Sequence, residues 1–113
     1  MIINNVDVSF DVFNPETLKR FQAFVDEYQN GLRDLGEVKA VDQFPKIYEV
    51  VVKALDGLFG PGMGARICGS EVTASTPVNA VLALLEEHKN QIDEMQRKAQ
   101  RVNKLFGELP NRK

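Results

Sequence analysis

The sequence contains one cysteine, Cys68, and one histidine, His88, and these two side chains could act as a nucleophile and its base. Such a pair also needs an acid that orients the histidine and groups that stabilise the oxyanion. No pattern in the sequence supplies either, so we assign no catalytic residue. We expect Cys68 to be a small buried apolar residue and His88 to be a helix residue at a wetter position.

A glycine-rich segment, Gly60-Pro61-Gly62-Met63-Gly64, invites comparison with phosphate-binding loops. A Walker loop ends in Gly-Lys-Ser/Thr, and a dinucleotide fingerprint needs a third glycine where Ile67 stands. Neither spacing is met, so the segment is expected to be a structural turn. Acidic neighbours such as Glu86-Glu87 and Asp93-Glu94 point to different sides of a helix and suit solvation. We therefore predict no cofactor and no metal site.

The composition also excludes several classes of protein. The chain has 113 residues, 14 Lys and Arg against 16 Asp and Glu, and a net charge of −2. One domain is expected at this length, without an internal disulfide or a cysteine-based zinc site. No signal peptide and no membrane span are expected, and a cytoplasmic location is predicted. The negative charge argues against nucleic acid as a partner. The macrodipole accounts for the basic residues near the C-terminus, which are Arg97, Lys98, Arg101, Lys104, Arg112 and Lys113.

Hydrophobic patterning predicts a mainly α fold: a small helical domain with a short N-terminal β-hairpin and a long C-terminal helix. Ile2-Ile3 can pair back across Asn4-Asn5, because asparagine tolerates the positive φ of a tight turn. Asn14-Pro15 and Thr76-Pro77 are each typical of a helix start. The expected elements of the single domain 1–106 are a hairpin at 1–13, helices at 15–35, 38–59 and 77–106, and a short turn or helix at 63–68, with a flexible tail at 107–113.

Pro45 lies inside the second of these helices. Proline removes a backbone donor and clashes one turn back along the helix. We therefore expect either a kink between Val41 and Phe44 or a helix that begins there with Asp42 as its cap.

The last expected helix carries an apolar seam with alternating spacings of three and four residues, which is a heptad pattern. Its first half, with Leu82, Leu84 and Leu85, is wide enough to sit in a globular core, whereas only a narrow seam continues after His88. About thirty residues give a helix of roughly 45 Å, longer than a compact domain of this size, so the last turns should project. Such a seam needs a second helix from another copy or another protein; the alternative is that helix 15–35 folds back along it. The seam residues are Val78, Val81, Leu85, His88, Ile92, Met95, Ala99, Val102 and Phe106.

The order of these pieces resembles the small tail assembly chaperones of long-tailed (siphovirus-type) bacteriophages and prophages. The resemblance rests on the N-terminal β segment, the Asn14-Pro15-Glu16-Thr17 helix start, the Leu58-Phe59-Gly60-Pro61-Gly62 segment, the turn ending in Gly69 and the long charged final helix. It implies a non-enzymatic protein of the host bacterial cytoplasm that binds and shields the tape-measure protein during tail morphogenesis. It also implies self-association, a frameshifted longer form, and absence from the mature virion.

The residues that we select as the partner or self-association surface are Phe59, Ile92, Met95, Ala99, Val102 and Phe106. A second hypothesis is a small oligomeric coiled-coil adaptor or regulator that binds another protein or DNA. A clustered basic recognition helix would support the DNA version, and none is visible in the sequence.

Overall fold

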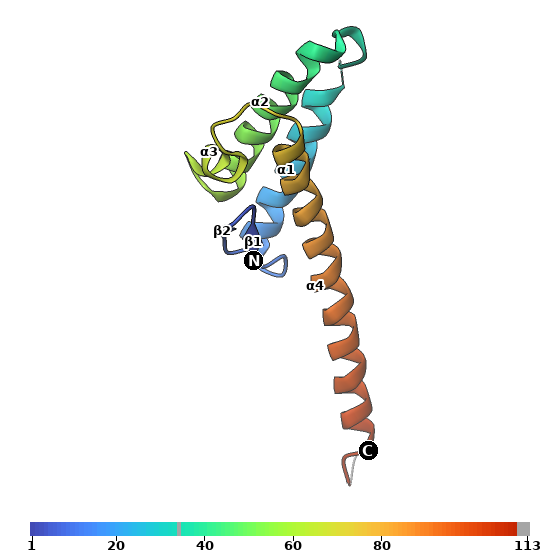
Figure 1. The fold of residues 1–113 in the computed structure, drawn as a ribbon. Helices are drawn as coiled ribbons and strands as arrows, with labels where there is room; N and C mark the ends of the chain where they lie inside the picture. The colour runs from blue at the N-terminus through green and yellow to red at the C-terminus, as the bar shows by residue number, and fades with distance from the viewer. Residues whose placement is uncertain (34, 111–113) are drawn as a thin grey trace.

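The computed structural model describes residues 1–33 and 35–110 and is built mainly of helices (Figure 1). A short hairpin precedes four α-helices and one 3-10 turn, so the expected mainly α class with an N-terminal hairpin and a long C-terminal helix is confirmed. The elements are β1 (Ile2–Ile3), β2 (Val6–Asp7), α1 (Pro15–Leu32), η1 (Leu35–Glu37), α2 (Ala40–Phe59), α3 (Met63–Cys68) and α4 (Ser75–Gly107).

The hairpin turns at the two asparagines, as expected. Asn4 and Asn5 have φ values of 48° and 69°, and Ile3 pairs with Val6 across them. The ladder is only two residues long on each strand, so the hairpin is shorter than the expected range 1–13. Beyond Asp7 only Val8 still pairs, with its amide donating to the Met1 carbonyl at 2.8 Å. The chain then packs on the helices, and its apolar residues Val8, Phe10 and Val12 are buried there.

α1 begins as the sequence indicates, with the Asn14 side chain accepting hydrogen bonds from the amides of Glu16 (3.0 Å) and Thr17 (3.3 Å). It ends at Leu32, earlier than the expected residue 35. Leu35 belongs to the turn η1, because the Gln43 amide group donates to the carbonyls of Leu35 and Val38 (2.9 Å each) and holds this connection against α2.

α2 begins at Ala40 and runs through Pro45 without interruption. The expected start at 38 and the expected cap by Asp42 are therefore wrong. Pro45 and Val41 are both exposed near the beginning of the helix, where water can solvate the carbonyl that the proline leaves without a donor. Pro45 is tolerated there because the backbone hydrogen bond that it cannot make lies outside the core.

α1 and α2 form a tightly packed pair that supports one side of the core (Figure 1). A Cβ at Gly31 of α1 would lie 2.6 Å from a methyl carbon of Val50 in α2, so the two helices approach closely at this point. The core also takes residues from the N-terminal segment, α3 and the first half of α4. Its least exposed large side chains are Phe24, Ile3, Leu55, Ile67, Leu84, Val51 and Pro77.

α4 starts at Ser75 and ends at Gly107, slightly beyond the expected range 77–106 at both ends. The Thr76-Pro77 pair therefore indicated a start slightly too late, because Thr76 already lies inside the helix and Ala74 occupies the cap position. Of the expected tail 107–113, Gly107 belongs to the helix, residues 108–110 are exposed, and residues 111–113, which include Arg112 and Lys113, lie outside the described residues.

The second half of α4 projects away from the other elements (Figure 1). Every residue from Glu94 to Pro110 is exposed. The radius of gyration is 18.6 Å and the molecule measures 68 × 28 × 21 Å, whereas a compact chain of this length has a radius of gyration of about 13 Å. α1 packs on α2 rather than along this half, so the alternative in which helix 15–35 covers the seam is wrong.

Candidate functional site

Cys68 and His88 have separate environments and do not form a nucleophile–base pair in the described part of the chain. The Cys68 side chain lies in the core at 2% exposure, and burial, with a smaller contribution from the negative charge of Asp56, raises the pKa of its thiol from 9.0 to about 11. The His88 ring stacks on Phe21 of α1 with centroids 4.9 Å apart. Each residue is thus accounted for by packing.

The glycine segment forms the turn between α2 and α3. Gly60 and Gly62 have φ values of 115° and 85°, which favour glycine. The Gly64 amide donates to the Asp56 carboxylate at 2.7 Å, so the amide that a phosphate would require is already bound by an anion. This geometry supports the structural interpretation of the segment.

Residues 1–33 and 35–110 contain neither a metal-binding cluster nor a membrane-spanning helix. No group of three or more histidine, cysteine or acidic side chains is gathered as a metal ion would require. None of the described helices combines the length and the apolar character needed to cross a membrane.

The selected surface residues fall into two separate places. Met95, Ala99, Val102 and Phe106 lie on the projecting half of α4 and are exposed, with Val102 at 49% and Phe106 at 51%. Ile92 is half-buried against the core where the helix leaves the domain.

Phe59 does not join them. It lies at the end of α2, half-buried, with its ring edge-on to Phe10 at a centroid distance of 6.4 Å. Its neighbours there include Arg20 and Met63, around a shallow hollow beside the N-terminal segment.

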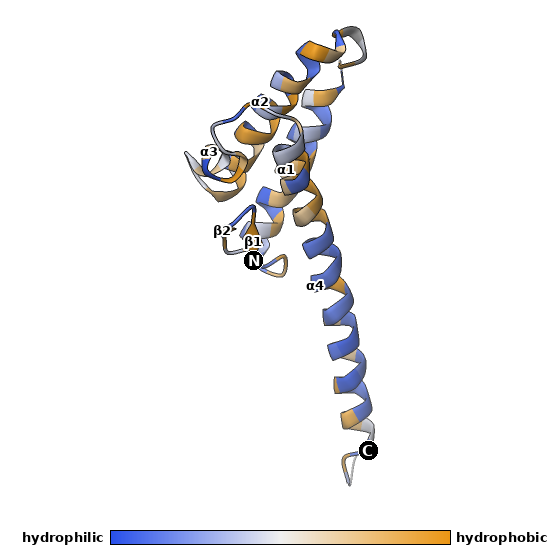
Figure 2. Ribbon diagram, viewed as in Figure 1, coloured by the Kyte–Doolittle hydropathy of each residue, from blue (hydrophilic) through white to orange (hydrophobic). Residues whose placement is uncertain are grey.

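We define the distal seam as the exposed apolar residues of the projecting half, which are Met95, Ala99, Val102, Leu105, Phe106 and Leu109. Leu105 and Leu109 are 47% and 53% exposed and were missed in the sequence-based selection. The signal for them was their position three residues after Val102 and Phe106, respectively, whose side chains line the same surface hollow. Figure 2 shows the projecting half of α4 as mainly hydrophilic with isolated hydrophobic patches.

The first half of α4 also has an exposed apolar face, contrary to expectation. We define the proximal seam as Val78, Leu82 and Leu85, which are 40%, 52% and 45% exposed. The helix turns its other side, with Pro77, Ala80, Val81 and Leu84, into the core. The stripe predicted for the core was too wide, because the domain covers only one side of the helix.

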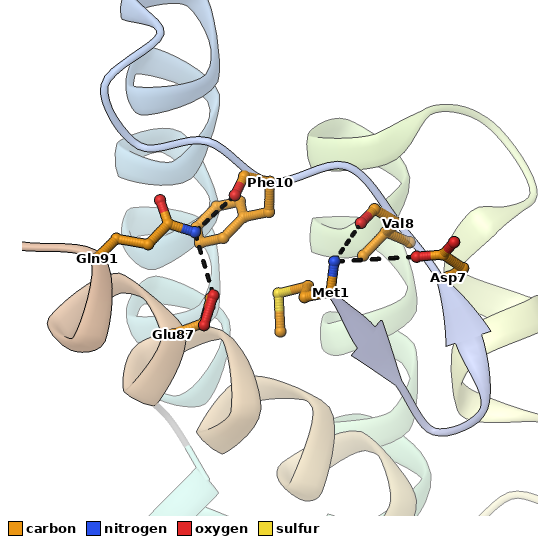
Figure 3. A network of polar contacts seen from close by, with 6 residues as sticks. All are labelled: Met1, Asp7, Val8, Phe10, Glu87 and Gln91. Atoms are coloured by element: carbon orange, nitrogen blue, oxygen red, sulfur yellow. Dashed lines mark hydrogen bonds and ion pairs between the residues drawn. The ribbon is translucent and has the colours of Figure 1, made fainter. Parts of the chain in front are cut away.

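Gln91 fixes the point at which α4 leaves the domain (Figure 3). Its amide nitrogen donates to the carbonyl of Phe10 at 2.7 Å and lies 3.2 Å from the Glu87 carboxylate. Its oxygen accepts a hydrogen bond from the Val12 amide at 2.9 Å. The N-terminal amine of Met1 donates to the carbonyl of Val8 at 2.8 Å and thereby closes the base of the hairpin. The Gln91 bonds therefore hold the N-terminal segment against α4 at Phe10 and Val12. The projecting half of the helix begins just beyond Gln91.

Fold and surface together define a mainly α protein whose last helix extends from a small core and carries an open apolar seam. The model of a protein family matches residues 4–113, and the chain belongs to this family, described as a family of unknown function (DUF6673). No curated protein and no solved structure matches the chain.

Proposed function

We propose that this protein is a non-catalytic phage tail assembly chaperone that binds and shields the tape-measure protein during tail morphogenesis. The observation that carries the proposal is the distal seam, which is exposed on the half of α4 that has no tertiary partner among the described residues. A helix with a narrow apolar stripe is stabilised when it packs against a second amphipathic helix. A long helical client with apolar faces is a partner of this kind.

The projecting geometry supports this role. A helix that extends beyond its domain can lie along a helical client with little steric interference from the domain. Its polar flanks then face water, so the complex presents a hydrophilic surface in place of the client's apolar face (Figure 2). The resemblance in the order of the elements supports the tape-measure protein as that client, and the host bacterial cytoplasm, rather than the mature virion, as the place of action.

Co-expression with the tape-measure protein encoded in the same genome tests the proposal. We expect the tape-measure protein to become soluble and to co-elute with this chain. The double variant Val102→Asp, Phe106→Asp should abolish capture, because it places two charges on the distal seam. The matched control Gln100→Asp, Asn103→Asp adds the same charge at polar positions of the same helix and should retain capture. Equal capture by both variants, or an insoluble tape-measure protein with the wild-type chain and with any frameshifted longer form, would contradict the proposal.

The heptad spacing also favours a second function, that of a small oligomeric coiled-coil adaptor or regulator of another protein or DNA. In that case the chain would elute as a defined oligomer and leave the tape-measure protein insoluble. Binding of duplex DNA that weakens steeply with salt would identify the DNA-binding version. The four basic side chains from Arg97 to Lys104 would then be its contact residues.

A further inference from the structure

One line of apolar residues runs along α4 from the domain to the tip, and the domain covers it in part only at Ile92. Val78, Leu85, Ile92, Ala99 and Phe106 follow one another at intervals of seven residues. Ile92 is half-buried and the other four are exposed. A strict seven-residue repeat drifts by about 20° per heptad on a straight helix, so it suits a partner helix that supercoils around it. The covering helix must therefore run beside the domain as well as beyond it.

Two residues of this line, one on each side of Met95, can pack on each other when two α4 helices lie antiparallel. Leu85 lies ten residues before Met95 and Phe106 lies eleven residues after it. Each is thus roughly 15 Å from Met95 along the helix. If a second α4 crosses in the opposite direction with the two-fold axis near Met95, Leu85 of each copy faces Phe106 of the other. The proximal seam of each copy then covers the distal seam of the other copy.

The charges of α4 are also divided at Met95. Residues 86–94 contain four acids, Glu86, Glu87, Asp93 and Glu94, and one base, whereas residues 97–104 contain four bases and no acid. An antiparallel pair places each acidic block beside the basic block of the other copy. A parallel pair would place like charges side by side, which is unfavourable. The ion pair of Glu94 with Lys98 at 3.5 Å bridges the two blocks within one chain.

We infer that two copies of this chain associate through an antiparallel pairing of their α4 helices, centred near Met95. The pairing needs no client. Its consequence for regulation, that the distal seam stays covered until a client helix displaces the second copy, rests on the proposed function.

The first experiment measures the mass of the isolated full chain by light scattering at tens of micromolar. We expect about twice the monomer mass of 12.7 kDa. The acidic-block variant Glu86→Lys, Glu94→Lys and the basic-block variant Arg97→Glu, Lys104→Glu should each weaken dimerisation at least tenfold, because each leaves two like-charged blocks facing each other. The chain that carries all four changes should regain the dimer. The four charged positions, and Leu85 and Phe106 of the seams, are all exposed on α4. Far-UV circular dichroism verifies that each variant is folded.

A second experiment tests the orientation of the pairing in a Cys68→Ala background. An oxidised mixture of Leu85→Cys and Phe106→Cys chains should give a covalent heterodimer, whereas neither chain alone should cross-link. Cross-linking of Leu85→Cys with itself would show a parallel pair and overturn the inference. A monomeric wild-type chain, or a dimer that neither charge reversal weakens, would also overturn it.

These outcomes are separate from those of the client experiment. A stable antiparallel dimer that fails to capture the tape-measure protein would reject the proposed function alone. Capture by a chain that is monomeric at every concentration would reject the antiparallel pairing alone.

Discussion

Two side-chain amides hold the N-terminal segment on the helices. The Asn4 amide nitrogen donates to the carbonyls of Ile67 and Thr76 at 3.1 Å each, and Gln91 bonds Phe10 and Val12. Val8, Phe10 and Val12 alternate with polar residues, so the sequence pattern itself indicates which side of this segment is buried. It could not predict Gln91, because a glutamine on a charged helix looks the same in sequence whether it faces water or a backbone segment.

Substitution of Gln91 should therefore destabilise the domain. Gln91→Leu leaves the Val12 amide and the Phe10 carbonyl without their partner, at a cost of about 1–3 kcal/mol in the free energy of unfolding. Gln91→Glu keeps an acceptor for Val12 but loses the donor to Phe10 and adds repulsion from Glu87. Urea unfolding of both variants and of Gln96→Leu, at an exposed position of the same helix, checks this. Equal stability of Gln91→Leu and Gln96→Leu would show that the clamp contributes nothing.

The Cys68 thiol should make stability depend on pH in the alkaline range. The folded chain keeps the proton until its pKa of about 11, whereas the unfolded thiol ionises near 9.0. Since the folded state then binds more protons than the unfolded state, stability should fall as the pH rises from 9 to 11. The raised pKa also lowers the thiolate fraction of the folded chain at pH 8, so thiol labelling should be slower for the native chain than for the unfolded chain.

Cys68→Ala provides the control for this alkaline loss of stability. It should retain whatever pH dependence arises from other groups and lose the part that belongs to the thiol. Urea unfolding at several pH values between 8 and 11 compares the two chains. Parallel stability curves for both would contradict the assignment.

At the level of elements, the helix centres could be predicted from the sequence and several ends could not. The apolar periodicity placed α1, α2 and α4 correctly, because burial of one helix face dominates their stability. The ends of α1 and α2 depend on tertiary contacts such as the Gln43 bonds to η1, which leave no local pattern. The same limit explains why the proximal seam was expected in the core: the sequence shows how many residues are apolar, but the width of the covering domain decides how many are buried.

Alanine substitutions at two glycines, Gly64 of α3 and Gly57 of α2, should have opposite effects on the free energy of unfolding. A Cβ on Gly64 would lie 2.8 Å from the carbonyl carbon of Val52 and closer still to its oxygen, so Gly64→Ala must push α3 away from α2. We expect a loss of about 2–4 kcal/mol in the free energy of unfolding. At Gly57 of α2 the nearest atom to such a Cβ is the Glu27 carboxylate oxygen at 3.9 Å. Gly57→Ala should therefore stabilise the chain by about 0.5–1 kcal/mol. Thermal unfolding separates the two outcomes, and a neutral Gly64→Ala would disprove the close approach.

The molecule as a whole combines a packed core with a long helix, α4, whose second half packs against no other element among the described residues. Core residues such as Leu55 and Leu84 are fully buried, whereas the helix beyond Glu94 is exposed on all sides. An unsupported helical segment of this length is marginal in water even with good helix formers. The stability of α4 must therefore differ between its two halves unless another chain supports the second half.

Hydrogen exchange along α4 tests this difference directly. At a concentration low enough for light scattering to give the monomer mass, amides of residues 97–106 should exchange within about tenfold of the unstructured rate, while those of residues 80–88 should be protected by close to the full free energy of unfolding. Raising the concentration should protect residues 97–106 far more than residues 80–88, because the projecting half has no packing of its own in the monomer whereas the first half already packs on the core. The Val102→Asp, Phe106→Asp variant should lose this dependence on concentration. Strong protection of residues 97–106 in the dilute chain would mean that the helix is stable by itself, and the physical reason for its seam to require a partner would then be gone.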